Sequence, residues 1–379
     1  MSNVTRNDSW VHTKEPFSRD AYDFLALILA TVGVWGICSN LLILILYFKF
    51  RTLRTPTNLL LVNINFSDLL LSVFGFSFHF VSCVSRQWIW NETGCVFVGF
   101  CKNIFGNVSI VTITVIAYRR YIQVACNKVI DFSWSWQAIS YIWIYSLAWS
   151  SAPLLGWNRY NLELHGLDCA LDQTPEGFSQ VSFVLLLFLA FLVAPASIMA
   201  FCYGYILYCI RMLRRLQDYQ TGSALKLKDY EIKVAKMCTL MILAFLFFGM
   251  PPYIMSLLVM CGYKDIMTPT VAIVSSVLVK LSTAANPLIY ILTSKKFRQG
   301  LLKLYCTWCW RMQAIGRRRL VGAKVKIGAT GNRLKKRVIF SSSSVSSIAA
   351  TSETDTQQST ENKPEIYGTN VKIIHVQPR

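Results

Sequence analysis

Long apolar stretches alternate with short polar segments along the chain as far as residue 293. About 20 apolar residues are enough for a helix to cross a bilayer, and stretches of at least about that length recur. They cover Phe24–Phe48, Asn58–Val84, Val96–Val124, Ile139–Gly156, Phe178–Ile210, Val234–Cys261 and Ile266–Thr293. The pattern predicts an all-α membrane protein whose residues 24–293 form a seven-transmembrane helix bundle.

The distribution of Lys and Arg predicts the orientation of the bundle, because cytoplasmic loops are enriched in these residues. The larger set lies in or at the borders of the segments that follow the first, third, fifth and seventh stretches: Lys49, Arg51, Arg54, Arg119, Arg120, Lys128, Arg211, Arg214, Arg215, Lys226, Lys228, Lys233, Lys236, Lys295, Lys296, Arg298 and Lys303. The opposite loops hold only Arg86, Arg159 and Lys264. We therefore expect a multi-pass protein of the plasma membrane with residues 1–23 as an extracellular N-terminal segment.

Composition agrees with a membrane protein and excludes several other classes. The chain has 379 residues, 54% hydrophobic and 15% charged, and its mean hydropathy of +0.42 is too high for an ordinary soluble protein. No apolar signal core occurs in the polar first 20 residues, so no cleavable signal peptide is expected. We attribute the net charge of +19 to topology and to contact with membrane lipid, because the sequence has no nucleic-acid-binding module.

Glycosylation sequons support this orientation. Asn3, Asn7 and Asn91 begin sequons on the predicted outer side, whereas the sequons at Asn65 and Asn107 lie inside apolar stretches and are interpreted as chance matches.

The chain has no pattern typical of an enzyme or of a metal site. Its histidines, His12, His79, His165 and His375, are too far apart in sequence for a triad or a metal site, and there is no Gly-rich phosphate loop.

Lys280 lies near the middle of the last apolar stretch. A lysine at that depth costs ~2.5–3.5 kcal/mol even on insertion scales, so it indicates a functional site. Burial disfavours the charged amine, and a neutral amine is a nucleophile that forms a Schiff base with a carbonyl ligand. The alternatives are a lysine that snorkels to the headgroups, which requires a position near a helix end, and one that pairs with a buried acid.

Four of the twelve cysteines are candidates for chemistry. Cys95 begins the third stretch and Cys169 lies in the outer loop between the fourth and fifth, where an oxidising exterior favours a disulfide that ties this loop over the bundle. The alternative is two free thiols. Cys306 and Cys309 follow the last stretch beside aromatic and basic residues, and they are either palmitoylation sites or unmodified packing cysteines.

A set of polar, aromatic and proline residues occurs in a characteristic order along the stretches. It consists of Asn40, Asp68, Arg120-Tyr121, Trp143, Pro195, Asn286-Pro287 with Tyr290, and Lys296-Phe297-Arg298. This set resembles the rhodopsin-like G-protein-coupled receptors over about residues 20–310. Lys280, which lies six residues before Asn286, narrows the resemblance to opsins. The segments 53–57, 129–136, 153–160 and 374–379 resemble encephalopsin and the teleost multiple-tissue opsins.

The resemblance implies a function. Retinal, 11-cis or all-trans, would be bound covalently to Lys280, and its photoisomerisation would activate a heterotrimeric G protein of the inhibitory class. The family's coupling and switch positions fall on Arg120, Tyr121, Glu231, Tyr203, Asn286, Pro287, Tyr290, Asp68 and Asn40. Residues 294–306 would form a short amphipathic cytoplasmic helix.

A protonated Schiff base needs a nearby anion. The position that supplies an acid in vertebrate visual opsins is Val98 here, so that counterion is absent. A second opsin position, six residues before the loop cysteine, is Glu163, our counterion candidate; the alternative is a solvated loop carboxylate. Arg159 and Asp172 match an opsin pair that holds the loop closed as a lid.

Two further polar residues fall on the expected retinal pocket. Lys102 lies two helical turns deeper than Cys95 on the same face, and His79 matches a position near the Schiff base. A charged Lys102 that Glu163 does not pair would favour an unprotonated Schiff base and near-ultraviolet absorption. The alternative for both is a polar side chain bonded to backbone or water.

The switch machinery departs from the family's pattern at two positions. Arg119 replaces the acid that precedes Arg-Tyr, so it would repel Arg120, weaken the resting state and raise basal signalling. Gly249 stands two residues before Pro251, where the family has a tryptophan. A second proline, Pro252, should sharpen the helix kink.

Residues 307–379 are predicted to be a disordered cytoplasmic tail. A basic segment from Arg311 to Arg337 would lie against anionic lipid. The Ser/Thr-rich segment from Ser341 to Thr360 would be phosphorylated by a receptor kinase and read by arrestin. The alternative is a solvated linker.

Two other functions remain open from sequence alone. One is a retinal photoisomerase or retinoid-binding opsin that signals weakly, which Gly249, Arg119 and Val98 favour. The other is a receptor for a diffusible acidic ligand that Lys280 would bind.

Overall fold

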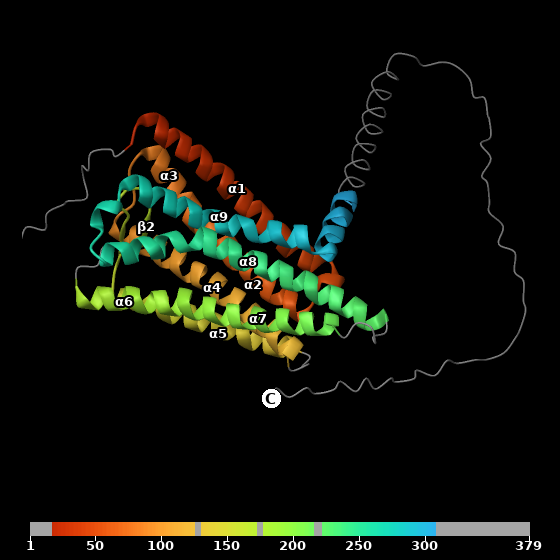
Figure 1. The fold of residues 1–379 in the computed structure, drawn as a ribbon. Helices are drawn as coiled ribbons and strands as arrows, with labels where there is room; N and C mark the ends of the chain where they lie inside the picture. Colours follow the sequence, from red (N-terminus) through yellow and green to blue (C-terminus); the bar gives the residue numbers. More distant parts are fainter. Residues whose placement is uncertain (1–16, 126–129, 173–176, 216–221, 308–379) are drawn as a thin grey trace, which may run out of the picture. The chain divides into compact units, whose positions relative to one another are not determined.

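The computed structural model describes residues 17–125, 130–172, 177–215 and 222–307 (Figure 1). Its helices form the predicted bundle. In chain order they are α1 (Arg19–Lys49), α2 (Pro56–Leu71), α3 (Ser77–Ser85), α4 (Glu92–Ala125), α5 (Phe132–Ser151), α6 (Phe178–Phe188), α7 (Ala194–Arg215), α8 (Gly222–Met260) and α9 (Pro269–Thr293). Short helical turns η1 (Arg51–Leu53), η3 (Ala152–Leu155) and η6 (Lys264–Ile266) join some of them, and residues 295–307 are also helical.

Two membrane crossings are each built from a pair of helices joined by a π-helical turn. The turn η2 (Ser72–Phe76) joins α2 to α3, and η4 (Leu189–Val193) joins α6 to α7. Such π turns are frequent at functional sites. In η2, Gly75 lies against the aliphatic stem of Lys102, because a Cβ there would be 3.5 Å from the Cγ of that lysine.

Several helices begin earlier than the apolar pattern predicts. The first turns are polar and are fixed by capping side chains, so hydropathy does not reveal them. Ser18 caps α1, which starts at Arg19 rather than Phe24, and Asp131 caps α5. The predicted span Ile139–Gly156 therefore begins too late, whereas its end agrees with η3, which is capped by Gly156.

The composition of α5 explains why hydropathy defines it poorly. Six membrane crossings in the described residues are long and apolar enough to span a membrane by length and composition. The helix α5 is not among them. It is 20 residues long, but it is rich in Ser, Trp and Tyr. Its packing against α2 and α4 places it in the bundle.

A two-stranded hairpin, which the all-α prediction did not include, lies at one end of the bundle. Strands β1 (Tyr160–Leu162) and β2 (Cys169–Leu171) pair antiparallel. The hairpin packs closely on α4, since a Cβ on Gly99 would lie 2.7 Å from the Tyr160 ring. Glycine at this position is what allows the close approach, and we call this the hairpin end of the bundle.

The largest apolar core lies toward the opposite end. It joins residues of α1, α2, α4, α5, α7, α8 and α9, with Ile43, Leu60, Ile116 and Tyr290 almost fully buried. Phe297 of the helix 295–307 packs into the same cluster. Between this core and the hairpin, the helices enclose a cavity.

Candidate functional site

Lys280 of α9 lies in this cavity, and its side chain is almost completely buried. Its Nζ donates to Asp168 Oδ2 at 2.6 Å and to Ser276 Oγ, one helical turn earlier, at 2.9 Å. The cavity has a volume of about 220 Å³. Its apolar lining includes Leu71, Ile110, Val184, Leu187 and Phe188. The cavity thus combines the Lys280 amine with a largely apolar wall.

The carboxylate that meets Lys280 belongs to Asp168, which the sequence analysis did not single out. The predicted disulfide between Cys95 and Cys169 is present, and it fixes β2 to α4. Asp168 immediately precedes the bonded cysteine, and its Oδ1 accepts from Cys169 N at 2.9 Å. The disulfide therefore holds this carboxylate over the cavity.

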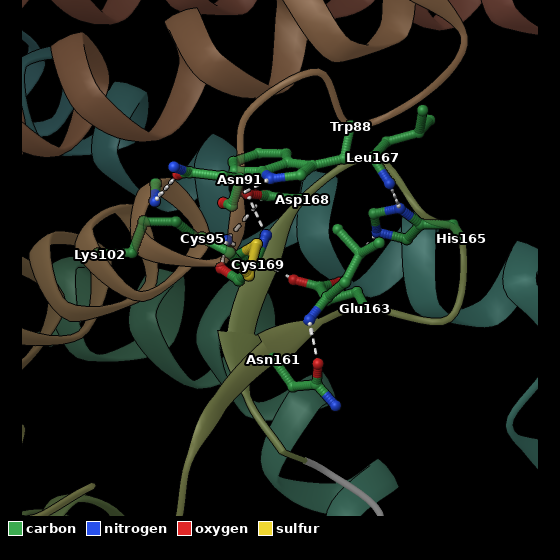
Figure 2. Close-up of a disulfide and its surroundings, with 12 residues drawn as sticks. Trp88, Asn91, Cys95, Lys102, Asn161, Glu163, His165, Leu167, Asp168 and Cys169 are labelled. Carbon is green, nitrogen blue, oxygen red and sulfur yellow. Dashed lines mark hydrogen bonds and ion pairs between the residues drawn. A yellow bond between two sulfur atoms is a disulfide. The ribbon is translucent and has the colours of Figure 1, made fainter. Parts of the chain in front are cut away.

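Glu163, the counterion candidate from the sequence, lies in the same cluster, but its described contacts are with other residues. The described contacts of its carboxylate go to Lys102, with Nζ 3.5 Å from Oε1, and to His165, with Nε2 2.9 Å from Oε2. The backbone N of Glu163 donates to Asp168 O, which holds the two acids together across the hairpin. Figure 2 shows this group beside the disulfide.

Lys102, which belongs to α4, contacts the carboxylates of both Asp168 and Glu163. Its Nζ lies 2.7 Å from Asp168 Oδ2, the same oxygen that Lys280 contacts, and also donates to Cys169 O at 2.7 Å. The prediction that Lys102 faces the pocket is confirmed, because it lines the cavity with Lys280. The two amines share one carboxylate oxygen.

His79 and His165 complete the cluster. The Nδ1 of His79 lies 3.1 Å from Asp168 Oδ2, and the two rings are stacked with centroids 5.4 Å apart. The expectation that the histidines are dispersed is therefore wrong for this pair. Leu167 N donates to His165 Nδ1, so that ring carries its proton on Nε2 and donates it to Glu163. Within the described ranges, no three His, Cys, Asp or Glu residues are arranged to hold a metal ion.

Both loop acids are strongly acidic in this setting. Burial alone would raise the pKa of Glu163, but Lys102 and His165 outweigh burial and lower that pKa to about 2. Burial opposes ionisation of Asp168 too, yet the neighbouring Lys102 and Lys280 hold the pKa of its carboxyl well below the usual value. With both acids ionised, two carboxylates face the amines of Lys102 and Lys280.

The predicted lid contact is confirmed. Arg159 Nε donates to Asp172 Oδ2 at 2.8 Å, and Asp172 N donates to Arg159 O. Tyr160 in β1 donates its hydroxyl to Ser150 O of α5, and Asn103 of α4 donates to that hydroxyl. The hairpin is thus joined to α4 and α5, and its two arms are joined to each other.

Polar residues of the predicted switch meet in the middle of the bundle. Ser109 donates to Asp68 Oδ1 at 2.6 Å and Asn286 to Asp68 Oδ2 at 2.8 Å. Asn40 donates to Gly36 O and Thr283 O, linking α1 to α9. The structure therefore brings these sequence-predicted residues together, and Pro287 lies inside α9 beside them.

The end opposite the hairpin carries the arginine pair. Arg119 donates to Thr57 Oγ1 of α2 and to Ile130 O, whereas Arg120 donates to Gln123 Oε1. Both arginines are buried. The partners named here draw Arg119 toward α2 and Arg120 toward its own helix, which separates their charges.

The remaining switch residues lie around this end. Tyr121 packs against Phe201 and Tyr205 of α7, and Tyr203 and Tyr290 are buried. The side chain of Glu231 lies outside the described residues, although its backbone belongs to α8.

The candidate modification sites are only partly covered. Asn91 is exposed, and its Oδ1 accepts from Gly94 N at the start of α4. Cys306 is an exposed free cysteine. Asn3, Asn7, Cys309 and the predicted tail from residue 308 lie outside the described residues.

Gly249 of α8 lines the cavity, together with Pro252 and Tyr253. Gly249, at the position that the resemblance assigns to a tryptophan, therefore supplies no ring to the cavity wall. Val98 is fully buried and supplies no charge.

The chain is similar to known proteins over most of its length. The sequence model of the family described as 7 transmembrane receptor (rhodopsin family) matches residues 39–290 of this chain. Opsin-3 from Mus musculus is 47% identical over 370 residues, which are 96% of this chain and 92% of Opsin-3. Melanopsin from Rattus norvegicus is 32% identical over 290 residues, 74% of this chain and 61% of melanopsin. The crystal structure of squid rhodopsin matches with a TM-score of 0.73 at 26% identity, covering 80% of this chain and 90% of that chain.

Proposed function

Because the chain belongs to the opsins, within the rhodopsin family of seven-transmembrane receptors, we propose that it binds retinal covalently through a Schiff base on Lys280. As an opsin it is a light-sensing, multi-pass membrane receptor and not an enzyme. Family membership implies a retinal chromophore and coupling to a heterotrimeric G protein. We propose where retinal attaches, what charge the linkage carries and which partners receive the signal.

The observation that carries the proposal is the buried Lys280 amine, bonded to Asp168 at the polar end of an apolar cavity. An aldehyde with a long hydrocarbon body fits this chemistry, because its carbonyl carbon meets the amine while its chain meets the apolar lining. When bound, retinal supplies light absorption and a change of shape by isomerisation.

Asp168 is the counterion in this proposal. Its carboxylate already neutralises the Lys280 amine in the cavity and would remain beside the nitrogen after condensation. An acidic ligand would have to compete with this carboxylate, which argues against the diffusible acidic ligand considered from sequence.

The charge balance favours a protonated Schiff base. Near-ultraviolet absorption was expected only if Glu163 left Lys102 unpaired, and the two side chains are 3.5 Å apart. Lys102 thus brings a carboxylate of its own to the cluster. We therefore expect a pigment that absorbs visible light at neutral pH.

Signalling is proposed to occur at the end opposite the hairpin, on the cytoplasmic side, with the N-terminus extracellular and the receptor in the plasma membrane. Arg120 and Tyr121 lie there, with Tyr203 and Tyr290 in the same part of the core. We propose an inhibitory-class G protein as the partner, and arrestin with a receptor kinase as partners of the tail. Palmitate on the exposed Cys306 would attach the helix 295–307 to the membrane.

One observation favours a second candidate, an opsin that isomerises or holds retinal but signals weakly. Gly249 lines the cavity where the family's large ring is expected, so movement of the ligand would be passed to α8 less directly. Both candidates share the Lys280 site and differ in light-dependent nucleotide exchange.

The test combines attachment with signalling. The full chain would be purified with 11-cis-retinal, reduced with borohydride, digested and analysed by mass spectrometry. A retinyl group on the Lys280 peptide is expected, and its absence would refute the attachment. Light-dependent GTP binding by an inhibitory-class G protein then supports the receptor, whereas isomerisation without GTP binding supports the second candidate.

A further inference from the structure

We infer that Lys102 is a second attachment site for an aldehyde in the same cavity. The inference rests on the proposed retinal binding and extends it to a residue on a different helix. Lys102 and Lys280 both line the cavity, and each nitrogen lies within hydrogen-bond distance of Asp168 Oδ2. The two amines are therefore at most about two hydrogen-bond lengths apart. A carbonyl group delivered to one is within a small side-chain movement of the other.

The surroundings of Lys102 would stabilise an imine cation. Asp168 lies 2.7 Å from its Nζ and Glu163 3.5 Å, so two carboxylates face this nitrogen, whereas one carboxylate, that of Asp168, is within ion-pair distance of Lys280 among the described contacts. Condensation replaces one cation by another, because the ammonium becomes a protonated imine. The charge balance of the cluster is preserved, and the one remaining N–H can donate to Asp168.

The covalent step needs no co-reactant. Asp168 accepts a proton from the Lys102 ammonium, and the neutral amine adds to the aldehyde carbon. The carbonyl oxygen then leaves as water with two protons from nitrogen, and a C=N bond replaces the C=O bond. Return of the proton from Asp168 gives the protonated imine. The same carboxylate oxygen touches both amines, so it can serve either one.

Occupancy of the two sites is expected to differ. Lys102 is held by three acceptors, namely Asp168, Glu163 and Cys169 O, which keep it protonated and slow to attack. Lys280 has two described partners, and one of them is the neutral Ser276 hydroxyl. Lys280 should therefore react first, and an adduct on Lys102 should be detected when Lys280 is removed.

The test maps the retinyl group chemically and does not depend on signalling. Lys280→Ala would be incubated with 11-cis-retinal, reduced with borohydride and digested, and a retinyl group is expected on the Lys102 peptide. The double variant Lys280→Ala with Lys102→Arg keeps the positive charge but cannot form the imine. It should lose the adduct, while any background on the exposed Lys49 stays equal.

The outcomes separate this inference from the proposed function. An adduct on Lys280 in the wild type, with none on Lys102 in a folded Lys280→Ala, overturns the second site and leaves the proposed function intact. Adducts on neither lysine in the wild type overturn both. Folding is checked by the presence of the Cys95–Cys169 disulfide. If Lys280→Ala does not fold, the same labelling is done on Lys280→Arg, which keeps the positive charge, and the lack of a Lys102 adduct in that variant overturns the inference.

Discussion

Replacing Asp168 by Asn should lower the pH at which the pigment loses its visible absorption. The carboxylate is buried and contacts Lys280, Lys102 and His79 through one oxygen. The amide keeps the shape of the side chain but removes its charge, so the protonated Schiff base at Lys280 loses its closest anion.

The expected size follows from the burial of this contact. Removing one partner of a buried ion pair costs about 3–5 kcal/mol, and 1.36 kcal/mol corresponds to one pH unit. The midpoint should therefore fall by about 2–4 pH units. Glu163→Gln is the matched control, because its carboxylate is also buried but contacts Lys102 and His165 instead. We expect a fall of about 1 pH unit, since a more distant charge acts through an effective dielectric constant of about 20.

The assay is a pH titration of the absorption spectrum of the purified pigment in darkness, for the wild type and both variants. A larger fall for Glu163→Gln than for Asp168→Asn would refute the assignment of Asp168 as counterion. Equal binding of retinal by the three proteins, measured after acid denaturation, ensures that the comparison reports the charge and not the occupancy.

Four further predictions concern Lys102, the contact between the hairpin and α4, Glu163 and the arginine pair. Lys102→Gln leaves two carboxylates facing one cation and should raise the midpoint in the same titration by about 1–2 pH units, whereas a fall would contradict the charge balance. Gly99→Ala places a Cβ 2.7 Å from the facing tyrosine ring of β1 and should destabilise the fold by about 1–3 kcal/mol, seen as a lower Tm; Gly106→Ala, where a Cβ meets nothing within 4 Å, is the control. Because its pKa is lowered from 4.5 to about 2, Glu163 contributes about 3 kcal/mol of stability that is fully present above about pH 4.5 and lost as the pH falls to about 2. Tm should accordingly depend less on pH between 5 and 3 in Glu163→Gln, and an unchanged slope would contradict this. Arg119→Glu should reduce GTP exchange in darkness by restoring the acid beside Arg120, and unchanged dark activity would argue against a weakened resting state.

The apolar pattern predicts the bundle because the bilayer demands long apolar helices, whatever their detailed packing. It does not predict where the helices begin. Capping by Ser18 or Asp131 and polar first turns carry no hydropathic signal. The π turns in the second and fifth crossings also escape detection, since an extra residue in a helix leaves the local composition unchanged.

Lys280 and the disulfide can be predicted from the sequence. A charged residue is rare inside a membrane span, and a cysteine in an outer loop stands out from the cysteines inside the spans. The acid that contacts this lysine cannot be predicted in this way. Glu163 and Asp168 belong to one short loop, and the pairing of β1 with β2 and the bond from Cys169 to α4 bring Asp168 into contact with Lys280. One feature of the sequence points to Asp168. A residue next to a cysteine that is bonded to a central helix must lie close to that helix, and Asp168 directly precedes Cys169.

The meeting of several bases on one oxygen of Asp168 has a consequence for every spectroscopic measurement on this protein. A proton gained or lost at one nitrogen changes the field at the others, so the groups titrate as a coupled set and not independently. A titration curve would be stretched or stepped compared with that of an isolated acid. Its inflections would describe the whole assembly, so variants are compared by how far the midpoint moves and not by its absolute value.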